Sequence, residues 1–583
     1  MSLDALRSFS TRTTPQRQPA GRATEKNNAG GYVFGIDDMA RLRRFLILGV
    51  EGGTYYVGAE ALTRDNAEVV VRLAETNPTA LVDEIVDVSV NGRAPKQNPA
   101  IFALAIAASS SNEQGRRYAL ANLSKVCRIG THLYLFNSYV EQFRGWGPAL
   151  KRGVGNWYLE RPVDKLAYQL LKYRQREGWT HRDLLRLSRP NPGSPERNEL
   201  FRYLMVKAKG GSQPSTRALE KYGDKARSPW AGVALPDLDI DLLPDLVEAF
   251  EAVNGSADFA VVAETDRAST SRIVELIGQH DLSWEMLPDS ALREAAVWEA
   301  LINKGMPQTA LMRQLPRLTK LGLTTGATGR VIAKQLVDPE LMKRGRVHPF
   351  SVLVALRTYA SGRAVRGTNT WPVTPLMVDA LDGGFYASYG AVVPTGKRIL
   401  HAFDVSGSMS MYPIAGMPVT PREAAAAVGL ASLNAEKDCT VIGFSDGRTN
   451  GAGRGGGYTG TRTAVQLDVT PRRRLDDVCK YMASLNFGAT DCALPMVWAM
   501  QNKADFDAIW MYTDNETFIG EPHPWQALKQ YREQVGHDVK FGVVAMTSTG
   551  FSIADPQDRS SIDIAGMDTA VPQMISDFSA GLI

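Results

Sequence analysis

The sequence predicts a multidomain protein of α and α/β classes. About the first two thirds fold as stacked α-helices, and the last third forms an α/β domain around a doubly wound parallel sheet. Three observations support this division. The 583 residues are too many for one hydrophobic core. Apolar residues recur at helical spacing up to about Asp382. After Thr395, apolar runs of strand length alternate with helical stretches.

Composition places the chain among ordinary globular proteins, with 44% hydrophobic and 22% charged residues. The four cysteines are scattered, without CxxC pairs or zinc-ligand spacing, and occupy Cys127, Cys439, Cys479 and Cys492. This usage argues against a disulfide framework and fits a reducing cytosol. Neither a secretion signal nor a membrane-spanning apolar run is found. We therefore expect a cytoplasmic protein with no membrane contact.

The chain divides into three predicted segments. Residues 1–25, rich in Thr, Arg, Gln and Pro, predict a disordered basic tail. Residues 26–394 form the helical part, with periodic segments at Asp38–Leu48, Asp65–Glu75, Pro99–Ala108, Glu113–Lys125 and Pro162–Arg176. Without a strict repeat or a βαβ rhythm, the pattern fits divergent helix pairs in a solenoid or an irregular all-α bundle. Residues 395–583 form the α/β domain.

Basic charge is concentrated in the helical part. The net charge is +4, yet residues 395–583 hold 16 Lys and Arg against 21 Asp and Glu. Arg144–Lys209 alone holds 15 basic and 6 acidic residues. Concentrated positive charge is typical of proteins that bind a polyanion, although a solvated helical surface gives the same composition.

Within this basic stretch, the predicted helix Pro162–Arg176 places apolar residues on one side and lysines and arginines on the other. His181 and Arg182 follow and extend the same surface. Interleaved tryptophans and tyrosines suit single-stranded nucleic acid, because bases stack on rings while phosphates pair with cations; most such rings nevertheless lie in cores. The candidate nucleic-acid-binding residues are Lys151, Arg152, Lys165, Lys172, Arg176, His181 and Arg182. Arg174 projects toward the apolar side and is a weaker candidate.

The last third predicts strands at Ile399–Phe403, Thr440–Phe444, Ala508–Tyr512 and Phe541–Ala545, and helices at Arg422–Leu433, Leu475–Leu485, Pro495–Gln501 and Pro524–Gln534. Ligand sites of such sheets form beyond the carboxyl ends of the strands. A DxSxS sequence follows the first strand, and a second aspartate ends the third. The predicted metal ligands are Asp404, Ser406, Ser408, Thr490 and Asp514. This all-oxygen set suits a hard divalent cation, above all Mg²⁺.

A simpler interpretation is that the α/β domain keeps these residues as part of its fold and that they never bind a metal ion. Enzymatic motifs do not occur: there is no HExxH, P-loop or Ser/His/Asp order, and GATGR near Gly326 lacks the Walker lysine. We predict no catalytic residues and no enzyme activity.

The metal constellation resembles the metal-ion-dependent adhesion site (MIDAS) of von Willebrand A domains. Long segments are similar to the Ro autoantigen (TROVE) family, including its bacterial members; they are Gly31–Tyr56, Lys96–Ala107, Val126–Phe136, Lys172–Ser188, Arg346–Tyr359, Gly488–Ala499, Tyr512–Gly520 and Met546–Arg559. The resemblance spans nearly the whole chain after the tail. Two features depart from the family, namely the long basic tail and a Gly-rich insertion at Asn450–Gly460, which predicts a flexible loop.

The resemblance implies a closed ring of HEAT-like helices completed by a von Willebrand A domain. It implies binding of small noncoding Y RNAs on the outer basic surface and of single-stranded 3′ ends of misfolded RNAs in the ring. It places His181 at an RNA-binding position and Lys165 near another. Bacterial members imply an exoribonuclease partner such as polynucleotide phosphorylase, tethered through a Y RNA. We expect a monomeric scaffold in RNA quality control; the alternative is a metal-dependent protein–protein adhesion factor.

Overall fold

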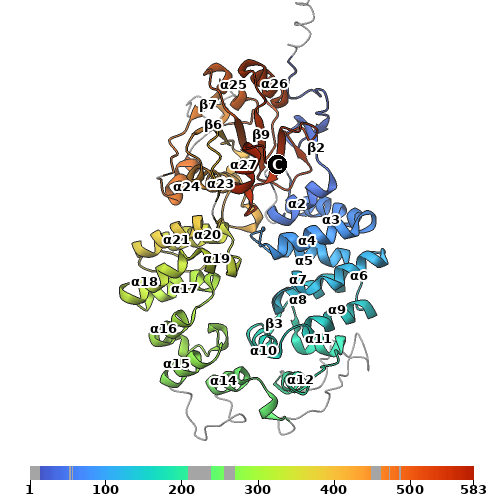
Figure 1. The fold of residues 1–583 in the computed structure, drawn as a ribbon, viewed down its shortest axis with the longest axis vertical. Coiled ribbons are helices and arrows are strands. Elements are labelled where there is room, and N and C mark those ends of the chain that lie inside the picture. Colours follow the sequence, from blue (N-terminus) through green and yellow to red (C-terminus); the bar gives the residue numbers. More distant parts are fainter. Residues whose placement is uncertain are drawn as a thin grey trace, which may run out of the picture.

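The computed structural model describes residues 13–50, 54, 57–207, 238–254, 270–390, 392–447, 461–471, 473–484 and 488–583. Within them, helices dominate up to Ala387 and an α/β domain follows, as predicted. Figure 1 shows two arms of helices that extend from the α/β domain and come together at the far end of the molecule. The helices thus form a ring that the α/β domain completes.

Each arm is a succession of helices that pack against helices one to three positions away in the chain. The first arm contains α2 (Asp38–Leu48), α3 (Ala59–Thr76), α4 (Pro78–Val90), α5 (Asn98–Ala107), α6 (Glu113–Ala121), α7 (Leu123–Val126), α8 (Gly130–Phe143), α9 (Pro148–Leu159), α10 (Val163–Lys172), α11 (His181–Ser188) and α12 (Pro195–Lys207). The second arm contains α14 (Asp245–Asn254), α15 (Thr270–Gln279), η5 (Trp284–Met286), α16 (Ala295–Lys304), α17 (Gln308–Lys320), α18 (Gly326–Leu336), α19 (Pro339–Gly345), α20 (Pro349–Ala360) and α21 (Pro375–Ala387).

Local sequence explains where these helices begin and end. Asp37 caps α2 by accepting a hydrogen bond from the Ala40 amide, and Pro349 occupies the first turn of α20, where a missing N–H costs nothing. The predicted helix Glu113–Lys125 is instead two helices, because Asn122 leaves helical geometry between α6 and α7.

The α/β domain contains a six-stranded sheet in the order β11-β9-β8-β5-β6-β7. Its strands are β5 (Ile399–Asp404), β6 (Cys439–Gly447), β7 (Thr461–Gln466), β8 (Ala508–Thr513), β9 (Lys540–Ala545) and β11 (Ser561–Ala565). All neighbours are parallel except β7, which runs antiparallel to β6 at the edge. The mostly parallel sheet is confirmed; β7 and β11 were not predicted, because their sequences lack long apolar runs.

Helices cover both faces of this sheet. The strands β5 and β8 are buried along their whole length, as expected for a doubly covered sheet. The helices of one face are α23 (Pro421–Ala435), α24 (Leu475–Ser484) and α27 (Val571–Ser579), and those of the other are α25 (Leu494–Gln501) and α26 (Pro524–Val535). The core beneath α23 and α27 is continuous with the core of the helical arms, so the two parts share buried apolar surface.

The ring closes at the α/β domain through three groups. Arg93, just after α4, forms an ion pair with Asp568, with Nε–Oδ2 and Nη2–Oδ2 distances of 3.0 and 2.6 Å. His348, which precedes α20 in the other arm, places Nε2 at 3.2 Å from the Arg93 carbonyl and 2.9 Å from that of Met567. Arg346 donates to the Val90 carbonyl at 2.7 Å. Both arms therefore contact each other and the α/β domain at one point.

At the far end, α10 of the first arm packs against α14 and η5 of the second. Lys172 on α10 lies 3.6 Å from the Glu285 carboxylate, and Tyr203 on α12 donates a hydrogen bond to Glu251 on α14. We call this contact the far joint.

The N-terminal segment corrects the predicted tail. Residues 1–12 lie outside the described residues, but the prediction of disorder is wrong for residues 13–25. Residues 13–35, here called the N-terminal strap, lie on the α/β domain and include β1 (Glu25–Lys26) and β2 (Tyr32–Gly35). The strand β2 pairs with β10 (Phe551–Ser552). A Cβ on Gly31 would lie 1.9 Å from the Thr517 carbonyl oxygen, so this close approach requires glycine.

The predicted flexible insertion Asn450–Gly460 lies outside the described residues. Among the helices that the structure describes, none is long and apolar enough to span a lipid bilayer.

Candidate RNA interface and metal centre

The candidate RNA-binding residues lie on neighbouring elements of the first arm. Lys151 and Arg152 are exposed on α9, Lys165 is exposed on α10, and Arg182 is half-buried on α11. The helix α9 packs against α11. These elements therefore carry much of the basic stretch on one section of the arm.

The predicted helix Pro162–Arg176 is too long. The helix α10 ends at Lys172, because the hydroxyl of Tyr134 donates to the carbonyls of residues 173 and 174 and the backbone turns away. A hairpin of β3 (Gln175–Arg176) and β4 (Trp179–Thr180) follows. Its two-residue loop, Glu177–Gly178, has φ of 52° and 76°, the geometry of a type I′ turn. Arg176 is thus exposed on a hairpin and shares no helix face with Lys165.

Lys172 and Lys165 both lie at the far joint, but they differ in exposure. The Lys172 side chain is only 8% exposed and pairs with Glu285, and its ammonium lies 5.2 Å from the ring centroid of Tyr168. Lys165 is 72% exposed and lies 3.7 Å from Asp281 of the second arm. Lys172 therefore acts in the contact between the arms, whereas Lys165 remains open to a ligand. Arg174 is exposed, because the helix ends before it, so its predicted orientation is wrong.

The expectation that His181 extends the basic surface is wrong. His181 is the first residue of α11, after a capping box between Thr180 and Asp183, and its side chain is 2% exposed. Its Nδ1 lies 2.9 Å from the Tyr158 hydroxyl on α9, and its ring packs against Tyr134 on α8. Burial lowers the pKa of His181 to about 3, so the imidazole is neutral at physiological pH. It links three helices and carries no charge to the surface.

Several aromatic residues of this stretch lie in the core and are not available to stack with bases. Trp157, Tyr158 and Trp179 are buried. Tyr168 is only partly buried and lines a cavity at the far joint.

The predicted metal ligands converge at the carboxyl ends of β5 and β8, which are adjacent in the sheet. Asp404 accepts hydrogen bonds from the Ser406 amide at 2.9 Å and from the Thr513 hydroxyl at 2.7 Å. The Ser406 and Ser408 hydroxyl oxygens are 3.1 Å apart. All five predicted ligands, including Thr490 and Asp514, are buried. The structure thus places the carboxylates of Asp404 and Asp514 and the hydroxyls of Ser406 and Ser408 at the strand ends. The carbonyl of Thr490 accepts hydrogen bonds from the amides of residues 518 and 519, in the loop after β8.

The electrostatics of this cluster fit a cation. Burial raises the pKa of Asp514 well above its usual value, and the negative charges of Asp404 and Glu516 raise it further. Burial also raises the pKa of Asp404. A divalent cation between the two carboxylates would relieve this repulsion, and Mg²⁺ prefers such oxygen donors. In the described parts of the chain, this cluster included, no three His, Cys, Asp or Glu side chains are grouped to hold a metal, so the hydroxyl oxygens would have to complete the donor set.

The group of candidate metal ligands, here called the metal cluster, faces the first arm on its open side. A cavity of about 20 Å³ lies over Ser408 and Asp514, walled by residues at the end of α2 and by Tyr412–Ala415. This is room for about one water molecule. The described residues therefore leave little free volume beside Ser408 and Asp514.

The N-terminal strap holds the loop that follows Asp514, an interaction that sequence reasoning missed. The Gln16 side chain is fully buried; its amide donates to Asp491 at 2.7 Å, and its oxygen accepts a bond from Thr517. Asn28 donates to the Glu516 carboxylate at 2.6 Å. No motif marks these polar residues, since their partners lie about 480 positions away in the sequence.

Comparisons with known proteins agree with this architecture. Residues 25–360 match the family model of the TROVE domain, and residues 398–579 match that of the Ro60 vWA domain. A protein of Caenorhabditis elegans named RNA-binding protein RO60 is 35% identical over 96% of this chain and 90% of its own length. A protein of the same name from Deinococcus radiodurans is 36% identical over 99% of both chains.

A solved structure has the same fold. The crystal structure of the Deinococcus radiodurans RO (RSR) protein is 34% identical, covers 94% of this chain and all of its own, and has a TM-score of 0.63. Both family models match in chain order and together cover the helical ring and the α/β domain. The chain therefore belongs to the Ro family, with a TROVE domain followed by a vWA domain of the Ro60 type.

Proposed function

We propose that this chain is a non-enzymatic RNA-binding protein. It holds small noncoding RNAs of the Y type on the basic section around α9–α11 and takes single-stranded 3′ ends of misfolded RNAs in the ring. The observation that carries the proposal is the cluster of exposed cations on a chain of which two relatives are named RNA-binding proteins. Phosphates supply most of the affinity for such a surface, and RNA shape supplies the selectivity.

A gel-shift series over increasing salt tests the proposal. It compares a hairpin RNA with the same hairpin bearing a single-stranded 3′ tail. We expect submicromolar binding, a steep fall in affinity with salt and a preference for the tailed RNA. Weak binding that is equal for both RNAs would reduce the basic section to an ordinary solvated surface.

Substitutions locate the surface. Alanine at Lys151, Arg152 or Lys165 should reduce the slope of log affinity against log salt by roughly 0.7–0.9 for each phosphate that the variant no longer neutralises. Lys334→Ala on α18 of the second arm is the matched control, since this lysine is also exposed. An equal effect in the control variant would mean that general charge, not this section, binds RNA.

We further propose Mg²⁺ as the ion of the metal cluster. Asp404, Ser406, Ser408, Thr490 and Asp514 would hold it, directly or through water, and it would supply positive charge between the carboxylates. Millimolar Mg²⁺ should raise the melting temperature of the protein in proportion to log concentration once the site is filled. Asp514→Ala should abolish that rise; a rise of the same size in the variant would place the ion elsewhere.

The second candidate function is metal-dependent adhesion to an acidic protein, favoured by the complete donor set at the strand ends. The cavity of about 20 Å³ over Ser408 and Asp514 opposes it, because a partner carboxylate would first have to displace Tyr412–Ala415. Binding to a protein partner that EDTA abolishes, in a protein that binds no RNA, would favour this candidate.

The remaining expectations concern assembly. We propose a monomeric, cytoplasmic scaffold that an RNA links to an exoribonuclease of the polynucleotide phosphorylase type. Co-purification of the nuclease that RNase treatment abolishes would support the RNA tether, whereas RNase-resistant association would point to direct protein contact.

A further inference from the structure

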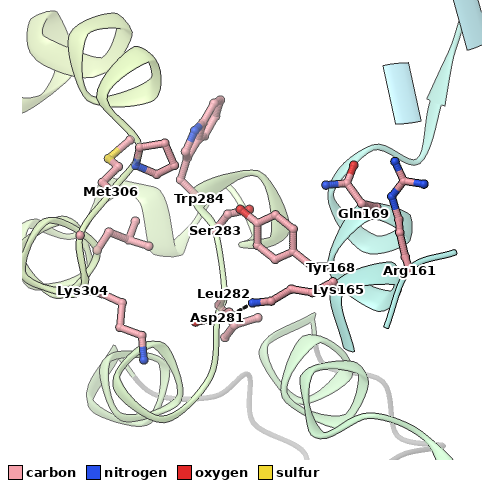
Figure 2. A pocket seen from close by; sticks show the side chains of 13 residues that line it. Arg161, Lys165, Tyr168, Gln169, Asp281, Leu282, Ser283, Trp284, Lys304 and Met306 are labelled. Atoms are coloured by element: carbon pink, nitrogen blue, oxygen red, sulfur yellow. Dashed lines mark ion pairs between the residues drawn. The ribbon is translucent and has the colours of Figure 1, made fainter. Parts of the chain in front are cut away.

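A cavity of about 430 Å³ opens at the far joint, within the usual size range of small-molecule sites. Its walls come from both arms of the ring. The first arm contributes Lys165 and Tyr168 from α10, and the second contributes Ser283, Trp284 and Lys304. Figure 2 shows Tyr168 projecting from α10 toward the Ser283–Trp284 segment, with Lys165 and Lys304 on opposite walls. A ligand here would touch both arms at once.

The lining combines aromatic, cationic and apolar groups. Tyr168 and Trp284 are partly buried and present ring surface, while Leu301 and Met306 add an apolar wall. The ammonium groups of Lys165 and Lys304 lie toward the same end of the view in Figure 2. Rings that stack with bases and cations that pair with phosphate are the two features of single-stranded nucleic-acid sites.

Two further observations indicate that this wall is built for a polar ligand. The hydroxyl of Ser283 and the indole N–H of Trp284 are buried and have no hydrogen-bond partner within the described parts of the chain. Buried donors without partners are uncommon in folded proteins and usually signal a missing ligand or water. The Lys165–Asp281 pair at 3.7 Å joins side chains that are 72% and 63% exposed, so it is weak and a phosphate can displace the carboxylate.

We propose that this cavity binds one nucleotide of single-stranded RNA, with the base against Tyr168 and Trp284 and the phosphate between Lys165 and Lys304. The proposal rests on the RNA-binding function proposed above and assigns a nucleotide subsite to it. Because the walls belong to different arms, the bound nucleotide ties the far joint together. Single-stranded RNA therefore stabilises the closed ring, by linkage between binding and closure.

Photo-crosslinking of the full chain locates the nucleotide. A ten-nucleotide single strand carrying one 4-thiouridine is irradiated with the protein, and the crosslinked peptide is identified by mass spectrometry. We expect crosslinks at Tyr168 or Trp284. Crosslinks confined to other parts of the chain would overturn the subsite.

Affinity measurements separate the contribution of the Tyr168 aromatic ring from that of the Lys304 charge. Tyr168→Ala should weaken binding of the single strand roughly 5- to 150-fold, the usual range for removal of one base stack, while Tyr168→Phe should stay within about threefold. Lys304→Ala should lower the salt slope by about 0.7. Lys304 is exposed at the end of α16, so this variant tests the site even if Tyr168→Ala disturbs α10. Lys334→Ala is the control.

The outcomes distinguish the subsite from the function. If wild-type protein binds neither hairpin nor single strand, the proposed function fails. If it binds both, and Tyr168→Ala and Lys304→Ala leave single-strand affinity unchanged, the subsite alone fails. An oligoglutamate peptide that competes as well as the oligonucleotide would also overturn it, since the aromatic wall would then be irrelevant.

Discussion

Exposure divides the seven candidate RNA-binding residues. Lys151, Arg152, Lys165 and Arg176 are exposed to solvent and Arg182 is half-buried, whereas His181 is buried and Lys172 pairs with the second arm. The difference arises from partners that are distant in the chain, such as Tyr158 and Glu285. A basic residue is therefore open to a phosphate group only where no neighbouring helix buries or pairs its side chain.

His181 consequently affects stability. His181→Ala removes a buried ring and leaves the Tyr158 hydroxyl without its 2.9 Å partner, so we expect the free energy of unfolding to fall by roughly 2–4 kcal/mol. Urea denaturation followed by tryptophan fluorescence measures this change. Lys165→Ala, an exposed substitution on the adjacent helix, should change stability by less than about 0.5 kcal/mol. A stable His181→Ala variant with weakened RNA binding would restore this residue to the RNA interface.

Buried histidines make stability depend on pH. Burial lowers the pKa of His401 to about 3 and that of His348 to about 4. Both values lie below the ordinary value of 6.5, so the unfolded chain binds protons that the folded chain excludes. Stability is therefore lost as pH falls from 6.5 toward 4, by up to about 1.4 kcal/mol per pH unit for each such histidine.

Melting curves of wild type and His401→Gln between pH 8 and 5 test this dependence. The variant lacks one titrating group, so its stability should fall less steeply below pH 6.5. The raised pKa of Glu516, about 7 because of its burial, acts in the opposite direction in both proteins and cancels in the comparison. If stability fell equally steeply with pH in both proteins, His401 would bind its proton as readily in the folded chain as in the unfolded chain.

Among the secondary-structure elements, the strands and helices with strong periodicity follow their sequences. The prediction for α2 is confirmed at both ends, and β5, β8, β9 and α23 lie within a few residues of their predicted positions. The predictions fail where a contact with a residue distant in the sequence determines the local structure. The helix α10 stops where Tyr134 binds the next carbonyls, and the N-terminal strap is ordered by the α/β domain.

The N-terminal strap contacts the loops that carry the candidate metal ligands Thr490 and Asp514, and Gln16 is its buried anchor. Gln16→Ala removes the 2.7 Å hydrogen bond to the Asp491 carboxylate and the bond from Thr517, and it empties a buried position, so we expect stability to fall by about 1–3 kcal/mol. The same variant should bind Mg²⁺ less tightly, because Asp491 adjoins Thr490 and Thr517 follows Asp514 by three residues. Melting curves with and without Mg²⁺ measure both effects. Gln18→Ala, an exposed neighbour, is the control; equal effects would mean that the strap is held elsewhere.

In the whole molecule, the ring depends on the interactions at its two closures. Arg93 meets Asp568 at the α/β domain, and the Asp568 side chain is only 3% exposed. Arg93→Ala would leave that carboxylate buried without its partner, which typically costs about 3–5 kcal/mol. We expect a lower melting temperature and a larger radius of gyration by small-angle scattering as the arms separate. Arg72→Ala, which breaks an exposed pair with Asp38, is the control. An unchanged radius would show that the shared core alone holds the ring.

The sequence by itself determined the two-part division, the mostly parallel sheet and the family membership that long similar segments suggested. These features depend on periodicity and on residues adjacent in the chain, which a linear pattern records. Only the tertiary structure decided that His181 is buried, that Lys172 joins the arms, that residues 13–25 are ordered and that a cavity forms between α10 and α16. Each of these depends on which distant side chains meet, because burial and pairing are properties of the folded chain and not of any local segment.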